Sequence, residues 1–504
     1  MPIRTQTPYL RCCAPFLLLM LSVILAGAAS TKSALNKPAT LPPDSLRDTM
    51  ETTIMKVKPA LVRIHAVSVD FESGHEVKRE DFGSGVVITR QGYVITNHHV
   101  AGNARQMTCT LATKEEIDAE LVGTDPLSDI AVLRLTPKTP RNFTYATFGN
   151  SSALRVGDRV FAMGSPLAFS QSVTMGVVSN TELIMPEVFG EDALTLDGEN
   201  VGTLVRWIGH DAQIFPGNSG GPLVNAQGEI VGINEISIGL GGAIPGNLAA
   251  EIARQLIAQG HVQRASLGLA VQPLLRSSTV KRGVLITDTE PNSSADKAGF
   301  HAGDILVKLN GRPVDVNFKE ELPPFNQQVM SLPIGKPVSA VVIRAGKELT
   351  LQVVPTERVD ARKPSREFKQ WGMTACNVTN AHNKKVDNGV RVTSLRPGGP
   401  ADNAKPSMNA GDIILEINGS PVRDLTTFAD MADKLNGDGH EQTPVTVAFE
   451  RDDERYLTVV KIGTPDAGYP SREIRKAWLP VSQQVLTGDL AAALGLGEQT
   501  GVRI

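Results

Sequence analysis

Residues 216–223 read Pro-Gly-Asn-Ser-Gly-Gly-Pro-Leu, which suits a serine presented as a nucleophile on a tight turn. A serine hydroxyl attacks poorly until a base takes its proton. Residues 96–100 read Thr-Asn-His-His-Val and offer a histidine, the side chain whose ordinary pKa is near neutrality. Asp129 precedes four apolar residues, where a buried carboxylate can orient an imidazole. We therefore expect Ser219 to attack, His99 to shuttle the proton and Asp129 to orient His99.

The glycines around Ser219 add a second element of the same chemistry. Gly217 and Gly220 permit backbone angles that a Cβ would forbid. The N–H groups of Gly217 and Ser219 can then point at one spot and hold a developing oxyanion. Loss of one such donor typically lowers the rate by about 10²–10³-fold.

Two neighbours compete for these roles. Adjacent residues at a strand end face opposite sides, so only one of His98 and His99 can reach Ser219. The pattern Thr-Asn-x-His-Val favours His99 and leaves His98 as a partly exposed polar neighbour. Asp125 is followed by a proline and is predicted to be a turn residue. No His-Glu-x-x-His or Cys-x-x-Cys string occurs, so we expect neither a metal site nor a cofactor.

The order histidine, aspartate, serine is that of chymotrypsin-type enzymes. The strings at 162–166, 174–179, 230–234 and 243–248 extend the match, and the chain resembles the HtrA (Deg) family of serine proteases over nearly all of residues 46–463. The resemblance implies a mostly β fold, in which a chymotrypsin-like double β-barrel precedes PDZ-like α+β domains. It also implies a homotrimer. The chain differs from the common family pattern at three positions beside the site, which we expect to alter its shape and pH profile more than its reaction: His98, His210 and Phe215.

The peptidase domain is predicted to span residues 46–263, which are rich in short β-type runs separated by turn residues. The helical period of residues 249–257 is expected to close this domain, and residues 71–82 are predicted to form a polar loop. A strand at Ile233-Asn234-Glu235-Ile236 is expected to pair with extended substrate and to wall the first specificity pocket.

A repeat follows the peptidase domain. The string Ala-Gly-Asp-Ile at 302–305 recurs at 410–413, and each copy resembles a PDZ domain, with boundaries at 264–357 and 367–463 around a linker at 358–366. In PDZ domains a peptide adds a strand to a sheet edge and its carboxylate is captured by backbone N–H groups. The expected carboxylate loops are Leu267-Gly268-Leu269 and Trp371-Gly372-Met373. The alternative is that both are ordinary first strands without a ligand. We expect the first copy to be the better receptor, because bulkier residues flank Gly372.

Both ends of the chain carry further signals. Residues 1–28 read as a secretory signal, with a positive start, an apolar core and a small-residue cleavage site; retention as an anchor is the alternative. Residues 29–45 read as a linker. We expect an exported, periplasmic or otherwise extracytoplasmic protein without a permanent membrane span once the signal is removed. Residues 464–504 read as a linker and the start of an incomplete third PDZ-like copy.

The charge balance excludes one class of partner. The formal net charge is −3, and loss of the two signal arginines makes it −5, with no basic cluster of the kind that binds nucleic acid. The combined prediction is an extracytoplasmic serine endopeptidase that hydrolyses unfolded or damaged proteins, whose PDZ domains bind peptides such as protein C-termini. The alternatives are a non-catalytic chaperone or PDZ scaffold, and a processing protease with one dedicated substrate.

Overall fold

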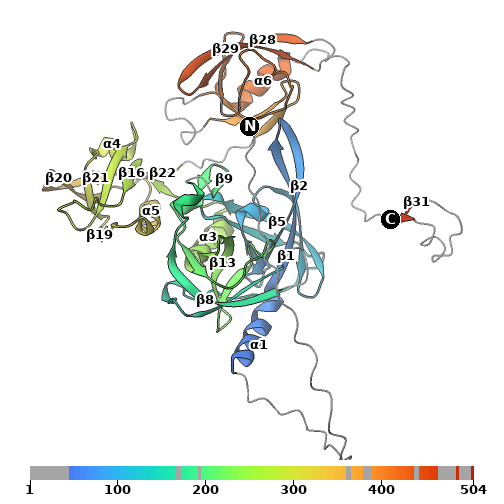
Figure 1. Ribbon diagram of the computed structural model, residues 1–504, viewed down its shortest axis with the longest axis vertical. Helices are drawn as coiled ribbons and strands as arrows, with labels where there is room; N and C mark the ends of the chain where they lie inside the picture. Colours follow the sequence, from blue (N-terminus) through green and yellow to red (C-terminus); the bar gives the residue numbers. More distant parts are fainter. Residues whose placement is uncertain are drawn as a thin grey trace, which may run out of the picture. The chain divides into compact units, whose positions relative to one another are not determined.

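The computed structural model describes residues 45–165, 172–190, 194–358, 365–378, 388–435, 442–463, 484–486 and 501–503 (Figure 1). The expected signal peptide and nearly all of the expected linker at 29–45 lie outside this part, as does most of the expected third PDZ-like copy. Within the described ranges, no helix has the length and apolar character needed to cross a membrane. The first described element is helix α1 (Ser45–Val57).

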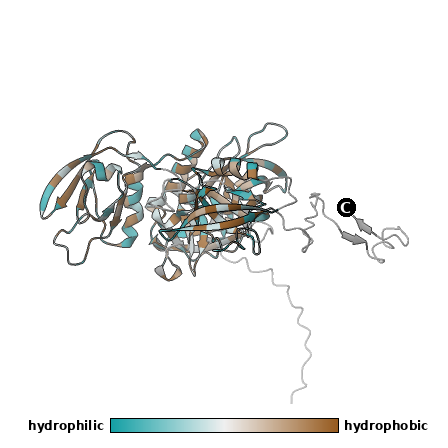
Figure 2. Cartoon of the chain, turned by 90° about the horizontal axis from the view of Figure 1, so that it is seen from above, coloured by the Kyte–Doolittle hydropathy of each residue, from teal (hydrophilic) through white to brown (hydrophobic). Residues whose placement is uncertain are grey.

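The first half of the peptidase region is a closed antiparallel barrel with the strand order β1-β2-β3-β6-β5-β4. Its strands are β1 (Leu61–Glu72), β2 (His75–Val87), β3 (Tyr93–Thr96), β4 (Ala104–Leu111), β5 (Glu116–Asp125) and β6 (Ile130–Leu135). Side chains alternate between exposed and buried along the first half of β5, as the pleat of a strand with one face in the core requires. Hydrophobic and hydrophilic stretches alternate in this way along the strands (Figure 2).

A second closed barrel follows, with the order β11-β14-β13-β12-β7-β8. Its strands are β7 (Arg159–Gly164), β8 (Ser172–Leu183), β11 (Trp207–His210), β12 (Pro222–Asn225), β13 (Ile230–Ser237) and β14 (Gly241–Pro245). The predicted closing helix is confirmed as α3 (Gly246–Gln259), and it ends at Gly260, whose φ of +79° forms the left-handed cap. Two closed barrels confirm the predicted chymotrypsin-like architecture.

The prediction of a polar loop at residues 71–82 is wrong. Strands β1 and β2 continue as a paired hairpin through this region, and the turn is only Ser73-Gly74. The hydrogen bonds of the ladder hold the hairpin, and Ser68 Oγ adds a donor to Asp81 at 2.9 Å. Most residues from Glu76 to Glu80 are exposed, so the polar composition that suggested a loop reflects solvent contact on a strand.

Each of the two repeats forms its own sheet with helices, as predicted. The first contains β16 (Leu269–Gln272), β17 (Val284–Thr289), α4 (Ser294–Ala298), β18 (Ile305–Leu309), β19 (Arg312–Pro313), α5 (Leu322–Met330), β20 (Val338–Arg344) and β21 (Lys347–Val353). The second contains β23 (Arg366–Phe368), β24 (Met373–Asn377), β25 (Val390–Leu395), β26 (Ile413–Ile417), β27 (Ser420–Pro421), α6 (Leu425–Leu435), β28 (Thr443–Arg451) and β29 (Glu454–Ile462). The repeated aspartate has one role in both copies, since Asp304 pairs with Arg344 and Asp412 pairs with Arg451, each at 2.7 Å.

The two repeats differ at one sheet edge. Among the described residues, strand β16 ends its sheet and pairs only with β17, whereas β24 pairs with β25 on one side and with β23 on the other. The edge that a PDZ domain offers to a peptide is therefore open in the first copy and covered by the chain itself in the second.

The start and the end of the first repeat lie side by side. A two-stranded sheet joins β15 (Ala265–Ser266) to β22 (Thr356–Glu357), and Arg358 N donates to Arg264 O at 2.8 Å. The Arg264 guanidinium holds Asp125 through two contacts of 2.6 Å, and both side chains are buried. Arg358 likewise forms two contacts with Glu199, at 2.8 and 2.5 Å.

Removal of Arg264 should destabilise the protein, because it leaves Asp125 buried without its cation. We expect Arg264→Ala to lower the free energy of unfolding by about 3–5 kcal/mol. The matched control is Arg254→Ala, which breaks a solvent-exposed pair with Glu251 and should leave the free energy of unfolding nearly unchanged. Urea unfolding of both variants checks this, and equal losses would contradict it.

Candidate active site

Ser219 lies on the turn between β11 and β12, where two glycines adopt conformations closed to other residues. Gly217 has a φ of +99° and Gly220 a φ of +82°. A Cβ on Gly220 would stand 2.2 Å from Thr96 Oγ1 and 2.3 Å from Ser84 O. Both glycines are therefore required by their positive φ, and Gly220 also by the close approach of the first barrel.

Ser84 on β2 fixes this turn to the first barrel. Its hydroxyl donates to Gly217 O at 2.5 Å and accepts from Ser165 N at 2.8 Å, and its N–H donates to Ser219 O at 2.9 Å. Thr96 Oγ1 in turn donates to Ser84 O at 2.7 Å. One side chain thus sets the position of the serine turn, a role that no motif around Ser84 reveals.

His99 and Asp129 form a tight pair. His99 Nδ1 lies 2.7 Å from Asp129 Oδ2, and His99 N donates to Asp129 Oδ1 at 2.9 Å. Asp129 is fully buried and has a φ of +52°, and its carbonyl accepts from Asn97 Nδ2 and from His98 N. These bonds hold the carboxylate in one orientation, so the ring of His99 has one preferred tautomer and direction.

The charge of Asp129 also sets the basicity of His99. Burial alone would lower the pKa of His99. The charge of Asp129 and its hydrogen bond, helped by the charge of Asp81, outweigh burial and raise the pKa above the ordinary 6.5.

The prediction that His98 is a partly exposed neighbour is wrong. The two histidines lie on the short helix α2 (His98–Ala101), where successive side chains are about 100° apart, and not at a strand end. His98 is only 2% exposed, whereas the side chain of His99 is 34% exposed. His98 Nδ1 lies 2.6 Å from Thr124 Oγ1, and Nε2 lies 3.2 Å from Asp197 Oδ2 in the hairpin of β9 (Thr195–Leu196) and β10 (Glu199–Asn200). Of the two, only His99 has an accessible ring.

Ser219 has few contacts of its own. Its hydroxyl donates to Glu235 O at 3.3 Å, and within the described ranges it has no hydrogen bond to His99. In the same part of the chain, the N–H groups of Gly217 and Ser219 have no acceptor. A turn with a serine and two free N–H groups beside an oriented imidazole is suited to acyl transfer.

Comparisons with known proteins agree with this geometry. A model of trypsin-like peptidase domains matches residues 83–233, and two models of PDZ domains match residues 265–354 and 391–448. The periplasmic serine endoprotease DegP of Salmonella typhimurium is 34% identical over 71% of this chain and 73% of its own length. This chain belongs to the HtrA family. It is a serine-type endopeptidase with peptide-binding PDZ domains.

Further relatives support the assignment. The periplasmic pH-dependent serine endoprotease DegQ of Escherichia coli is 30% identical over 81% of this chain and 91% of its own length. A solved structure of the HtrA-type protease AlgW with a decapeptide matches with a TM-score of 0.51 and 28% identity, over 62% of this chain and 99% of that one.

Two positions where this HtrA chain departs from the common pattern have different environments. His210 is fully buried on β11, and burial lowers its pKa to about 4. It is therefore neutral near neutral pH and adds no charge to the site. Phe215 is 40% exposed at the start of the serine turn. Asp125, predicted to be a turn residue, does precede a 3-10 turn, but it is buried and bound to Arg264 and Ser128.

The expected carboxylate loops of the two PDZ copies differ in the hydrogen bonds that their N–H groups make. In the first copy, Gly268 has a φ of +71° and its N–H donates to Ser266 Oγ at 3.3 Å, next to the open edge of β16. In the second copy, the N–H groups of Trp371 and Gly372 both donate to Phe368 O at 3.0 Å. Leu267, Trp371 and Met373 are buried in the two domain cores.

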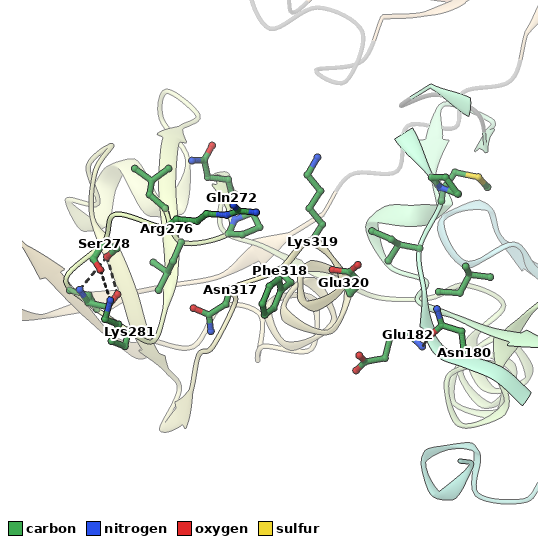
Figure 3. Close-up of a pocket in the computed structure, with 18 residues that line it drawn as sticks. Asn180, Glu182, Gln272, Arg276, Ser278, Lys281, Asn317, Phe318, Lys319 and Glu320 are labelled. Atoms are coloured by element: carbon green, nitrogen blue, oxygen red, sulfur yellow. Dashed lines mark hydrogen bonds between the residues drawn. The ribbon is translucent and has the colours of Figure 1, made fainter. Parts of the chain in front are cut away.

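A surface pocket lies away from the serine turn (Figure 3). Residues of three segments line it: 180–186, 272–281 and 317–320. Ser219, His99 and Asp129 are not among them. Among the described residues, no His, Cys, Asp and Glu side chains gather as a metal site would.

Proposed function

We propose that Ser219 is the nucleophile, His99 the general base and Asp129 the residue that orients His99. The observation that carries this proposal is the contact of 2.7 Å between His99 Nδ1 and a fully buried Asp129, beside a serine turn shaped by two glycines of positive φ. Ser219 Oγ attacks the peptide carbonyl and gives its proton to His99, which then returns it to the leaving amine. Water releases the acyl group in the second step.

The N–H groups of Gly217 and Ser219 supply the oxyanion site in this proposal. The strand Ile233-Asn234-Glu235-Ile236 binds the substrate backbone. Ladder pairing of β13 with β12 ends at Pro222 and Ile233, and the N–H and carbonyl of Asn234 then bond to Gly221 O and Gly220 N of the serine turn. In this proposal the extended chain pairs with the edge of β13 from Glu235 onward, opposite β14.

The substrates in this proposal are unfolded or damaged proteins outside the cytoplasm. Relatives named as periplasmic support the location, and a secretory signal at residues 1–28 would deliver the chain there. An extended segment fits a strand edge, whereas a folded protein rarely offers one. We expect reduced, denatured casein-like chains to be cut at many sites and a stable folded protein to remain intact, as mass spectrometry of the products would show. Cleavage at a single site would favour a dedicated processing protease.

We place the domain boundaries at 46–263, 264–357 and 367–463. A homotrimer is the assembly that the family resemblance implies, and analytical ultracentrifugation would test it.

The raised pKa of His99 predicts the pH profile. The neutral imidazole is the base, so kcat/KM falls as the pH drops through the pKa of His99 in the free enzyme. We expect this acidic limb to lie above pH 6.5, the ordinary value. Asp129→Asn should move the limb to lower pH and reduce kcat about 10⁴-fold. His210→Thr is the matched control and should leave the limb in place, because His210 is already neutral there.

We propose the first PDZ copy as the receptor for C-terminal peptides. Its strand β16 is open on one edge, whereas β23 fills the corresponding edge of the second copy. Phe368 of β23 packs edge-on against Phe428 of α6, with ring centroids 4.6 Å apart, and its carbonyl takes the N–H groups that would bind a carboxylate. The second copy thus holds its own chain where a ligand would lie.

Peptide titration of the full-length Ser219→Ala chain checks this assignment. Because a charge-assisted hydrogen bond is worth about 1.5–3 kcal/mol, amidation of an apolar C-terminal peptide should weaken binding about tenfold or more. Gly268→Ala should also weaken binding, since its Cβ would stand 2.3 Å from Ser293 Cβ. The matched variant Gly372→Ala should bind normally. Equal affinity for free and amidated peptide would mean that the first PDZ copy binds internal segments of unfolded proteins rather than C-termini.

A further inference from the structure

Glu235 is a buried carboxyl that the proposed triad does not use. It lies on β13, is 6% exposed, and its main-chain carbonyl accepts the hydrogen bond of Ser219. The register of β13 and β14 shifts between Asn234 and Ile236, so Glu235 is the extra residue of a β-bulge. A bulge redirects a side chain, and here the carboxyl lies inside the protein, next to Trp207.

The two oxygens of Glu235 have different neighbours. Oε2 accepts a hydrogen bond from Nε1 of Trp207, a fully buried side chain of β11. Oε1 is also buried, and no donor from the described residues reaches it. The carboxyl lies within hydrogen-bonding reach of Asp129, which is an acceptor as well. Two carboxyl groups form a hydrogen bond only if one of them carries a proton.

The proton belongs on Glu235. Both oxygens of Asp129 already have a partner in His99, since Oδ1 accepts from His99 N and Oδ2 faces His99 Nδ1. Among the described residues, the side chain of Glu235 has the neutral donor Trp207 and no salt bridge to a cation. Burial and the charge of Asp129 raise the pKa of Glu235 well above its ordinary value, against the opposing effect of the Trp207 hydrogen bond.

We propose that Glu235 is a positioning residue, a protonated carboxyl whose Oε1 donates a hydrogen bond to the Asp129 carboxylate and holds it toward His99. This rests on the proposed triad and extends it to a chain that runs from Trp207 through Glu235 and Asp129 to His99. Since Glu235 also accepts from Ser219 through its carbonyl, one residue contacts both the nucleophile and the orienting acid.

The protonation state can be measured without activity. Infrared difference spectra of Ser219→Ala, with and without Glu235→Gln, should show a protonated carboxylic acid band at neutral pH that the second substitution removes. Absence of such a band would overturn the proposal. Because Ser219 is replaced in both samples, this result does not depend on the proposed catalytic roles.

Kinetics with Ser219 present supply the second test. Glu235→Gln keeps a neutral donor and an acceptor, so kcat should stay within about threefold and the acidic limb of kcat/KM should not move. If Glu235 were ionised, loss of its charge would move the limb clearly to lower pH, and the proposal would fail. Glu235→Leu removes the donor and should lower kcat about tenfold or more with KM unchanged, since hydrogen bonds to charged groups are among the stronger ones.

The matched control is Glu229→Gln, a half-buried acid just before β13 that bonds only to Asn225. It should leave kcat, the acidic limb and the infrared band unchanged. A loss in Glu235→Leu that appears equally in Glu235→Gln would assign Glu235 a purely structural role.

Discussion

Replacement of Ser219 by alanine is expected to reduce kcat for peptide hydrolysis on the order of 10⁶-fold, as loss of the nucleophile does in other serine proteases. The side chain is only partly buried, and its hydroxyl makes one hydrogen bond, to Glu235 O. Alanine therefore leaves no buried group without a partner, and we expect the fold to be unchanged. Hydrolysis of a denatured protein by wild type and variant, at matched concentration, measures the effect.

The matched control is Ser277→Ala, an exposed serine outside the proposed site. It should keep full activity. If Ser219→Ala retained activity within tenfold of wild type in a preparation free of other proteases, the chain would not cut by this serine. Binding of clients without cleavage by the wild type would then point to a chaperone or scaffold.

Replacement of His99 by alanine should be as damaging as loss of Ser219, because base and nucleophile act as a unit. The adjacent His98 offers a matched comparison. His98→Asn should keep most of kcat, since this ring is buried and points to Thr124 and Asp197 rather than to solvent.

The cost of His98→Asn should appear in stability instead. It disturbs two polar contacts of a buried ring, and a buried group left unsatisfied costs about 1–3 kcal/mol. Activity and thermal unfolding of both variants measured together would decide the assignment. If His98→Asn lost the activity and His99→Ala kept it, the base would be His98.

The glycine turn could be predicted from sequence because local backbone chemistry determines it, and the pairing of His99 with Asp129 because their motifs and chain order resemble those of a known family. A serine turn with Gly217 and Gly220 needs positive φ, and only glycine adopts it freely. The closing helix α3 likewise followed from the apolar period of residues 249–257. The recurrence of the string around Asp304 at Asp412 predicted two domains of the same fold. The equivalent ion pairs that the two aspartates form with arginines confirm this prediction.

Features that depend on distant contacts could not be predicted in this way. The burial of His98 depends on Asp197, about a hundred residues along the chain. The direction of the Glu235 carboxyl depends on a bulge, and a shift of one residue in register reverses the face of every side chain. Strand β23 has only three residues, too few to show the alternation of apolar and polar residues that indicates a strand. Its pairing with β24 could therefore not be predicted from the sequence.

The paired ends of the first repeat bear on self-digestion. An endopeptidase that binds extended chains also encounters other molecules of the same enzyme, including the segments that join their domains. Here Arg264 is buried against Asp125, and the β15–β22 pair binds both ends of the repeat by backbone hydrogen bonds. A protease must open such a segment before it can cut it, and where opening is fast and reversible the rate of cutting follows the population of the open form. We therefore expect the ion pair that stabilises the junction also to slow cleavage of the enzyme by other molecules of itself.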